Sequence, residues 1–399
     1  MLQKKIKTKI FIVCLILFVL NIGVYGNEKL DITHGPYLID QCEDAITIVW
    51  FTNNPSSSWV EYSGDKNFGT FPTWGGYPKI AKNSNHGLID ANTTKHVIRL
   101  ENLSPGAIYK YRVNSREIRQ FNPYEVLYGD TFASEVYSFE TLNPQRSEFS
   151  FCVVADIHER ASVLDTLLEI GDTEKMDMIF YTGDMLNWIG DENRIFDGMI
   201  DVSVKHFAKN KPFVYVRGNH ETRGAKARKL FEYFPHHSNE FYYAFKQGET
   251  YFIILDVGED KPDSHPVYAG LVDFDNYRDV QTEWLKKEVE SDAFKNAKYK
   301  VVVNHIPLFT NSKGHGGEDA TKKWGQILNK AKIDLMISGH HHQYAFIQKN
   351  KNGNKFPILV LGTDMILNAD VNKNNMNLEM KNIDNSIEEN ITIKPKWKK

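Results

Sequence analysis

The hydrophobic pattern divides the chain into two parts with different secondary structure. Up to about residue 142 the apolar residues form short runs, and residues 108–113 alternate apolar and polar with the period of two that a half-buried strand requires. Gly, Pro, Asn and Ser cluster between the runs. Short strands separated by such turn residues are typical of a β-sandwich. The strands we expect are 45–51, 59–62, 96–100, 108–113 and 136–139.

One stretch in this first part resembles a known module. Residues 103–113, with Ser-Pro-Gly before the strand, are similar to the fibronectin-type-III pattern that leads into a late strand. Tyr109 then either hydrogen-bonds back to the loop before it or packs as a plain core aromatic. Residues 68–90 are rich in Gly, Asn and aromatic residues and predict no clear element. We therefore expect residues 27–143 to form a fibronectin-III-like sandwich domain without catalytic residues.

After a polar linker at 143–147, the pattern changes to alternating strands and helices. Residues 149–155 are almost continuously apolar, as expected for a strand that is covered on both faces. We therefore expect an α/β domain over 149–370. Its predicted strands are 149–155, 176–181, 212–216, 299–303, 335–337 and 356–361, with a hairpin at 241–245 and 251–256. Its predicted helices are 162–170, 193–208 and 280–290.

The end of the chain differs from both parts. Residues 371–399 are rich in Asn, Lys and Glu. A segment of this composition buries too little apolar surface to offset its loss of conformational entropy. We predict a polar, mobile tail, apart from a strand at 390–393.

The beginning of the chain has the pattern of a secretory signal. Four lysines and no acidic residue precede an apolar run at 10–20, and small residues lead to Gly26. The run is too short to span a bilayer comfortably. We expect residues 1–26 to be a signal peptide, cleaved near Gly26, and the protein to be exported, either periplasmic or secreted, with no membrane span after processing. An uncleaved membrane anchor is the alternative.

Removal of that segment changes the charge of the protein. The chain has 48 basic and 51 acidic residues, and losing four lysines leaves 44 against 51, so the net charge becomes −7 instead of −3. A mildly acidic protein is unsuited to bind nucleic acid through bulk electrostatics. Only Cys42 and Cys152 remain, so the sequence implies no disulfide framework.

Metal-binding side chains follow five of the strands predicted in the α/β part. Ligands gather where the strands of such a sheet end. His340 to His342, taken alone, could be a solvated loop cluster, but four more strand ends carry Asp, Asn or His. Carboxylates, imidazoles and an amide oxygen, with no thiolate, are the donors of a two-metal site. The strand-end residues are Asp156 and His158, Asp184, Asn219 and His220, His305, and His340 and His342.

Two ions that lie close together require a shared carboxylate, and Asp184 on its tight Gly-Asp turn is the best candidate. The motifs Asp-x-His, Gly-Asp, Gly-Asn-His-Glu, His and Gly-His-x-His occur in that order. Over about residues 149–363 the chain resembles the calcineurin-like metallophosphoesterases. With the β-rich part ahead of this region, the order is similar to that of the purple acid phosphatases.

The resemblance implies a four-layer αββα core with two metal ions at one edge of the paired sheets. The ions would be divalent, or one divalent and one trivalent, with Fe, Mn or Zn expected. His341 belongs to neither ligand set. The implied ligands are Asp156, His158, Asp184 and His342 for one ion, and Asp184, Asn219, His305 and His340 for the other.

The sequence departs from the purple acid phosphatases at two positions. Their Gly-Asp-x-x-Tyr motif supplies the tyrosine that binds iron and gives the colour, and here Asn187 stands at that position. They also lack the histidine that this chain has at His158. We interpret His158 as the replacement for the tyrosine, and we expect a non-purple relative without a fixed ferric site.

Two cations at such a site lower the pKa of a bridging water, and the resulting hydroxide attacks phosphorus in line. We therefore predict an exported dinuclear-metal phosphoesterase that hydrolyses phosphate monoesters and acts on a small phosphorylated substrate. Asp184 and His220 are the predicted catalytic residues. His220 follows a ligand directly, so it would protonate the leaving oxygen or orient the phosphate. Alternatively, it only hydrogen-bonds a nearby carboxylate.

Substrate contacts are predicted for Asn219, His220 and His315. His315 lies in the Gly-rich stretch 311–317, ten residues after His305. The similar loop of the family lines the substrate mouth, so contact with phosphate or leaving group is expected. A plain exposed loop histidine is the alternative.

Two other functions fit the same pattern. One is a phosphodiesterase that acts on nucleotides or lipid head groups with the same metal chemistry. The other is an exported protein that binds a glycan or a partner and carries a vestigial phosphoesterase domain. The complete ligand set argues against the second, because ligands are lost first when activity is lost. The oligomeric state is left open by the sequence.

Overall fold

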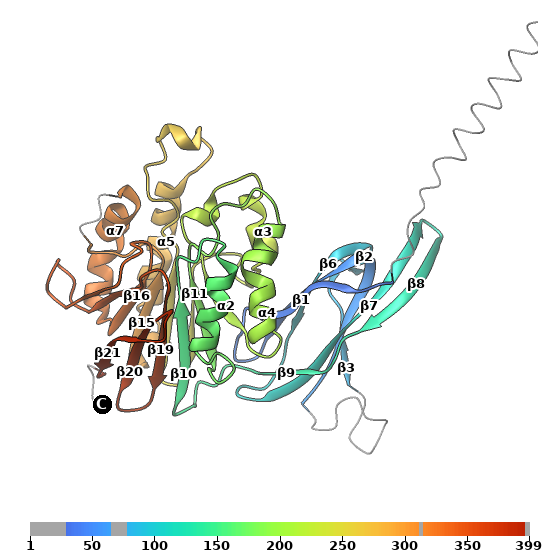
Figure 1. Cartoon of the computed structure of the whole chain (residues 1–399), viewed down its shortest axis with the longest axis horizontal. Coiled ribbons are helices and arrows are strands. Elements are labelled where there is room, and N and C mark those ends of the chain that lie inside the picture. Colours follow the sequence, from blue (N-terminus) through green and yellow to red (C-terminus); the bar gives the residue numbers. More distant parts are fainter. Residues whose placement is uncertain (1–28, 65–77, 311–313, 396–399) are drawn as a thin grey trace, which may run out of the picture.

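The computed structural model describes residues 29–64, 78–310 and 314–395. The predicted signal peptide, residues 1–26, lies outside the described residues. Within the described ranges, no helix is both long and apolar enough to cross a membrane. Figure 1 shows the N-terminal strands on the right and the helix-covered part of the chain on the left.

The N-terminal part consists of strands, as the sequence predicted. Two expected strands, 45–51 and 59–62, belong to one long strand, β2. Strands β1 and β8 were not predicted, because His, Gly and Pro interrupt β1 and exposed residues dominate β8. The longer strands are β1 (Ile32–Ile39), β2 (Ile46–Ser63), β6 (Thr93–Leu100), β7 (Ile108–Asn122), β8 (Glu125–Ala133) and β9 (Tyr137–Glu140). Three short ones lie within 79–89: β3 (Lys79–Ala81), β4 (Ser84–Asn85) and β5 (Leu88–Ile89).

Strand β2 changes partners along its length. Its first half pairs with β1 and β6, and its second half pairs with β3 and β7. A register shift between Phe51 and Ser56 separates the halves. Both halves contribute to one core, in which Trp50 is fully buried and its indole N–H donates to Ser115 Oγ at 3.0 Å. The hydroxyl of Tyr109 accepts the backbone N–H of Ser104 at 2.9 Å, so the predicted bond back to the preceding loop is confirmed. The fibronectin-III-like assignment stays a prediction.

The α/β part contains two sheets. In the first, β10, β11 and β12 run parallel, and β19 pairs antiparallel with β10. In the second, β14, β15, β16 and β18 run parallel, with β13 and β17 at the edges. The first sheet has β10 (Phe149–Val154), β11 (Met178–Thr182), β12 (Phe213–Val216) and β19 (Met365–Val371). The second has β13 (Tyr243–Gln247), β14 (Thr250–Leu255), β15 (Tyr299–Asn304), β16 (Leu335–Ser338), β17 (Ala345–Ile347) and β18 (Ile358–Val360).

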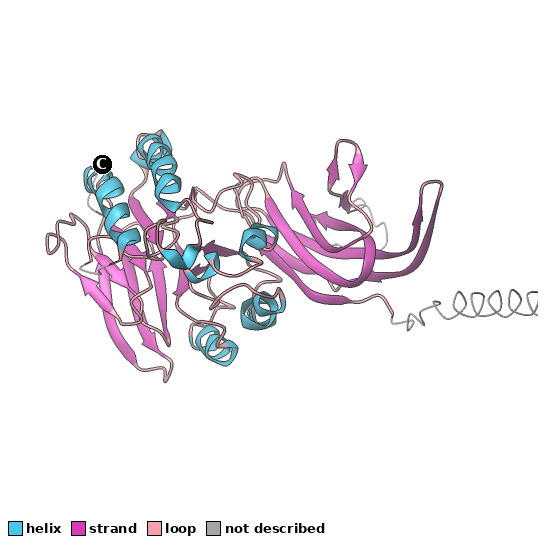
Figure 2. Cartoon of the chain, turned by 90° about the horizontal axis from the view of Figure 1, so that it is seen from above, coloured by secondary structure: helices cyan, strands magenta, loops and turns pink. Residues whose placement is uncertain are grey.

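The two sheets pack face to face with helices on their outer sides (Figure 2). Phe151 and Phe180 of the first sheet meet Phe252 of the second in a shared apolar core. A second cluster lies between the first sheet and helices α2, α3 and α4, and a third between the second sheet and helices α5, α6 and α7. The layer order is therefore helix, sheet, sheet, helix. The helices are α2 (Ala161–Ile170), α3 (Asn193–Ile195), α4 (Asp201–His206), α5 (Phe274–Glu288), α6 (Asp292–Asn296) and α7 (His315–Ala331).

The three predicted helices are present with changed bounds, and two helices, α6 and α7, were not predicted. Residues 193–208 form α3, a π-helical turn and α4, and the helix expected at 280–290 begins earlier, at Phe274. Helix α7 was not predicted, because three glycines and several charged residues obscured its apolar stripe. Its buried Ala320, Trp324 and Leu328 recur every four residues, the spacing of one helix face.

The prediction of a mobile tail was wrong for residues 376–389, whereas the strand expected at 390–393 is confirmed as the end of a longer strand. Strands β20 (Met376–Asn382) and β21 (Ile387–Ile393) form an antiparallel extension of the first sheet beside β19. Met376, Leu378 and Met380 alternate with polar residues and are buried in the core between the sheets. The composition of the segment hid this alternation, because Asn, Lys and Glu occupy the opposite face of the strands.

One contact joins the N-terminal strands to the α/β part within a single sheet. Strand β1 pairs parallel with β12 at Ile39 and Phe213, so the first sheet continues into the N-terminal strands. The hydroxyl of Tyr37 also donates to the carbonyl of Tyr233 at 2.6 Å. The two parts of the chain are therefore connected by more than their covalent linker.

The buried face of β20 provides a test of the C-terminal strands. Leu378→Ala should lower the free energy of unfolding by about 2–5 kcal/mol, because it leaves a cavity between the sheets. Asn377→Ala, on the exposed face of the same strand, is the matched control and should change it by no more than about 0.5 kcal/mol. Chemical denaturation measures both. Equal, small effects of the two substitutions would show that the segment does not pack on the core.

Candidate metal centre

The five strand ends that carry the predicted ligands converge at one edge of the paired sheets. Because strands in both sheets run parallel, their carboxyl ends lie at the same edge. Asp156 follows β10, Asp184 follows β11, Asn219 follows β12, His305 follows β15, and His340 and His342 follow β16. The structure brings all these side chains together; their role as ligands remains a prediction.

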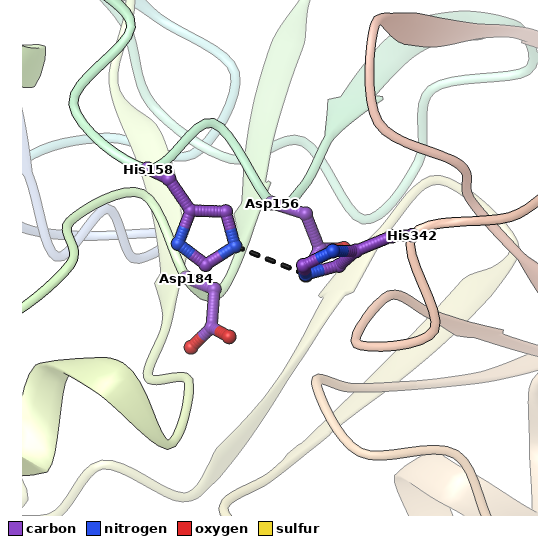
Figure 3. Close-up of side chains that lie close together, drawn as sticks. All are labelled: Asp156, His158, Asp184 and His342. Carbon is purple, nitrogen blue, oxygen red and sulfur yellow. Dashed lines mark hydrogen bonds and ion pairs between the residues drawn. The ribbon is translucent and has the colours of Figure 1, made fainter.

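Four side chains form the first cluster. Ligand atoms of Asp156, His158, Asp184 and His342 lie within 4.8 Å of one another. Figure 3 shows the His158 and His342 rings turned toward each other, with their Nε2 atoms 3.0 Å apart. Nε2 of His342 also lies 3.5 Å from Oδ1 of Asp156. Asp156 and Asp184 are buried and His342 is half exposed, so the cluster opens to solvent on the His342 side.

The second cluster shares Asp184 with the first. Ligand atoms of Asp184, His305 and His340 also lie within 4.8 Å of one another. Nε2 of His305 is 3.0 Å from Oδ2 of Asp184. The amide oxygen of Asn219 is 3.0 Å from Nδ1 of His340, which adds a neutral oxygen donor. The position of Asp184 in both clusters is the one that a bridging carboxylate requires.

The hydrogen bonds around the site fit metal ions. Nδ1 of His305 donates to the carbonyl of Thr182 at 2.9 Å, which directs Nε2 at Oδ2 of Asp184. Two imidazole nitrogens at 3.0 Å, as in His158 and His342, share at most one proton between them. A bound cation would accept the lone pairs of the Nε2 atoms of His305, His158 and His342. The donor set suits Fe, Mn or Zn.

The electrostatics of the metal-free site are consistent with that fit. Burial raises the pKa of Asp156 to about 7 and lowers the pKa of His340 to about 3. Burial also lowers the pKa of His305, but the charge of Asp184 outweighs it and raises the pKa to about 10. In return, and against the effect of its burial, the pKa of Asp184 lies below its usual range because of His305. A cation in the second cluster would take the place of the His305 proton.

The backbone at the strand ends is held in an uncommon conformation. Asp156, Asp184, His340 and His342 have positive φ angles of 55°, 50°, 73° and 60°. Side chains with a Cβ rarely adopt this region, and each instance costs about 1–3 kcal/mol. At Gly183, where φ is 82°, a Cβ atom would lie 2.5 Å from Nδ1 of His305. The strain is concentrated at the residues that face the centre.

Glu221 was missed by the sequence interpretation, which gave a role only to its neighbours Asn219 and His220. Its fully buried carboxylate accepts the backbone N–H groups of Asp184, Leu186 and Gly218, each at 2.9 Å. It therefore ties the Gly-Asp turn to the Gly-Asn-His turn. Glu221 is the fourth residue of the Gly-Asn-His-Glu motif, and this position in the motif could have identified it as part of the site.

His220 lies beside the clusters with both ring nitrogens occupied. Its backbone N–H donates to Oδ1 of Asp184 at 2.9 Å, and its Nδ1 donates to the carbonyl of Asn187 at 2.8 Å. Its Nε2 is 3.1 Å from a guanidinium nitrogen of Arg223 and 3.8 Å from Oδ2 of Asp184. Because arginine always carries its protons, this Nε2 is the acceptor. In this arrangement His220 is neutral.

The structure also shows the surroundings of His315 and Asn187, to which the sequence analysis gave particular attention. His315 is the first residue of α7 rather than part of a loop, and its Nε2 lies 2.7 Å from Asp275. It belongs to neither cluster of the centre, so a contact with substrate stays a prediction. The side-chain amide of Asn187 donates to the carbonyl of His158 at 3.0 Å and thereby supports the loop that carries this histidine.

Comparison with known proteins agrees with the fold. Residues 149–344 match the family model described as calcineurin-like phosphoesterase. The chain is 23% identical to purple acid phosphatase 21 of Arabidopsis thaliana over 302 residues, covering 70% of this chain and 61% of that protein. It is also 23% identical to purple acid phosphatase 18 of the same plant, covering 78% of this chain and 65% of that protein. The chain thus spans less than two thirds of the length of these relatives.

A solved structure shows the same fold. The purple acid phosphatase PPD1 from yellow lupin (Lupinus luteus) seeds superimposes with a TM-score of 0.63 at 17% identity, covering 90% of this chain and 74% of that one. Together with the family match, this defines the class of the α/β part: residues 149–344 form a domain that matches the calcineurin-like phosphoesterases. More particularly, the chain is similar in sequence to purple acid phosphatases and shares the fold of one of them.

The shared carboxylate predicts the effect of substitution on metal content. Reconstituted with Mn²⁺, which suits oxygen and nitrogen donors, the protein should hold about two ions per chain. Asp184→Ala removes a donor from both clusters and should lose most of this metal, whereas His305→Ala should lose about one ion. Asp191→Ala, at an exposed carboxylate outside both clusters, is the control. Elemental analysis after gel filtration measures the content; full retention in Asp184→Ala would contradict the shared role.

Proposed function

We propose that the protein is an exported phosphatase that hydrolyses monoesters of small phosphorylated molecules. The observation that carries the proposal is the position of Asp184 in two adjoining ligand clusters at the carboxyl edge of the sheets. The match of residues 149–344 to the calcineurin-like phosphoesterase model supports phosphoester hydrolysis, and the lysines and apolar run of residues 1–26 support export. The open side of the centre at His342 gives a small substrate access.

Two cations bound by these clusters would supply Lewis acidity, which would lower the pKa of a water and offset the charge of the phosphoryl oxygens. The residues of the chain provide the geometry. Glu221 fixes the turns that carry Asp184 and Asn219 by accepting three backbone N–H groups. The donors are therefore preorganised before a substrate arrives, which avoids reorganisation during the reaction.

Arg223 links the proposed acid to the phosphate. Glu259 accepts from Nε and one terminal nitrogen of Arg223, at 2.8 and 2.9 Å, and the other terminal nitrogen faces Nε2 of His220. An incoming phosphate is a stronger acceptor for that nitrogen than a neutral imidazole. We infer that the substrate draws Arg223 away from His220, whose Nε2 then takes up a proton from solvent and delivers it to the leaving oxygen.

A substrate panel tests the proposed activity. With Mn²⁺, Zn²⁺ or Fe²⁺ present, the protein should release phosphate from monoesters faster than it cleaves diesters, and chelation should abolish both reactions. A preference for diesters of nucleotides or lipid head groups would replace the proposal with the phosphodiesterase function. No hydrolysis by a protein that holds both ions would indicate a binding protein with a vestigial domain.

The role of His220 is tested by the leaving group. His220→Asn should keep the metal content near that of the wild type and lower kcat by roughly 10²–10⁴-fold on alkyl phosphates, which need a protonated leaving oxygen. Activated aryl phosphates should be affected much less, and the alkaline limb of the pH–rate profile should flatten for alkyl esters only. Equal losses on both ester types would assign His220 to phosphate orientation. Loss of metal would make it a structural residue.

A further inference from the structure

A hollow lined by lysines lies at the edge of the second sheet where its parallel strands begin. Its volume is about 810 Å³, and seven lysines line it. They come from β13, α6, the start of β15, the connection from α7 to β16, the turn between β19 and β20 and the end of β21. Lys300 in β15 precedes His305 of the candidate metal centre by five positions, about 17 Å along a strand. The hollow therefore lies at the opposite edge of the sheets from that centre.

A second hollow, of about 570 Å³, adjoins the first. The two share three lysines, and the second adds Lys286 of α5 and Lys330 of α7, so nine lysines line the pair. Glu249 and Glu290 are the acidic residues of the described chain that line it as well. We call the two hollows together the lysine groove. Its positive charge contrasts with the whole chain, in which 51 acidic residues outnumber 48 basic ones.

Glutamates beside the lysine groove offset only part of its charge. Nζ of Lys295 lies 2.6 Å from Glu290, and Nζ of Lys298 lies 3.2 Å from Glu249. Lys286 has a similar partner on its own helix. In each pair the glutamate is more than half exposed, and exposed ion pairs are weak because water and salt screen them. An anionic ligand can therefore replace these glutamates at little cost.

Lys300 distinguishes the groove from an ordinary solvated lysine face. Lysines that serve only solubility remain in water. Only 6% of Lys300 is exposed, and its Nζ lies 4.6 Å from the centroid of the Phe294 ring. Burial lowers the pKa of Lys300, and the neighbouring Asp334 offsets part of that effect. An anion in the groove would stabilise the charged form of this side chain.

The remaining lining residues argue against two kinds of anionic partner. In the described chain no aromatic residue lines the first hollow, and Phe294 in the second is buried, so the groove offers no platform for stacking nucleic-acid bases. No arginine of the described residues lines it either, so the planar fork that matches phosphate is missing. None of the large apolar side chains exposed on the described surface lies in the groove, so it lacks the residues that insert into a bilayer.

The same lining suits an acidic carbohydrate. The lysine ammonium groups are point charges that pair with carboxylate or sulfate without strict geometry. Gln145, Asn296 and Asn374 add side-chain amides, which can both donate to and accept from sugar hydroxyls. Two adjoining hollows that share lysines favour a chain with repeated acid groups over a compact anion.

We propose that the lysine groove binds a segment of an acidic polysaccharide. Its carboxylate or sulfate groups pair with the lysines of both hollows, and its hydroxyls bond to the amides of the first. Because the groove and the candidate metal centre lie at opposite edges of the sheets, the bound protein keeps that centre open to small substrates. The binding is independent of the proposed phosphatase activity.

Fluorescence anisotropy with labelled heparin and labelled hyaluronate tests the proposal on full-length, metal-loaded protein. Heparin carries sulfates and carboxylates, whereas hyaluronate carries carboxylates alone, so the two probes identify the acid group that the groove prefers. Neutral dextran is the ligand control and should not bind. The wild type should bind at least one of the acidic probes at about 50 mM salt, and the affinity should fall steeply toward about 200 mM as lysine contacts are screened.

Charge reversal locates the binding site. Lys330→Glu/Lys373→Glu reverses one exposed charge in each hollow and should weaken binding by at least about tenfold, with phosphatase activity and melting temperature near those of the wild type. Lys229→Glu/Lys322→Glu reverses two exposed charges outside the groove and is the matched control, which should bind like the wild type. Removing the metal with a chelator should leave the affinity unchanged.

The proposal is overturned if neither acidic polysaccharide binds, if the groove variant binds as tightly as the control variant, or if chelation abolishes binding. Tighter binding to single-stranded DNA or to phosphatidylserine vesicles than to both polysaccharides would also overturn it, because the groove would then serve a nucleic acid or a membrane.

Discussion

The placement of one carboxylate, that of Asp184, governs the arrangement of the candidate metal centre. It follows β11 in the first sheet, yet its oxygens face His305 from the second sheet and the backbone N–H of His220. Burying this charge is unfavourable unless it is paired. The chain meets that requirement with the imidazole of His305 and the backbone N–H of His220. Glu221 fixes the position of the turn by accepting the backbone N–H of Asp184. The two sheets must therefore pack in one register for the centre to form.

The sequence predicted the residues of the centre because their signal is local. Each candidate ligand follows an apolar strand, and parallel strands bring their ends to a common edge whatever the details of packing. The hydrogen-bond partners of a residue cannot be predicted in this way. That Arg223 is held by Glu259, or that Glu221 joins two turns, depends on how loops from separate strands meet, and no single stretch of sequence contains this information.

The errors of prediction have a common physical origin. Helix α7 and strands β20 and β21 are rich in polar residues, but each buries a narrow apolar face against a large existing core. Composition averaged over a segment hides such a face, whereas the period of its apolar positions reveals it. Likewise, β2 was divided at residues 52–58, although the backbone continues through this stretch and only exchanges partners there.

The central claim is that two metal ions share Asp184, and anomalous scattering from crystals of the Mn²⁺-loaded protein tests it most directly. Data collected on both sides of the manganese absorption edge should show two peaks, about 3.5–4 Å apart, one on either side of the Asp184 carboxylate. One peak should lie among Asp156, His158 and His342, and the other among Asn219, His305 and His340. A single peak, or two peaks that do not both contact Asp184, would contradict the account.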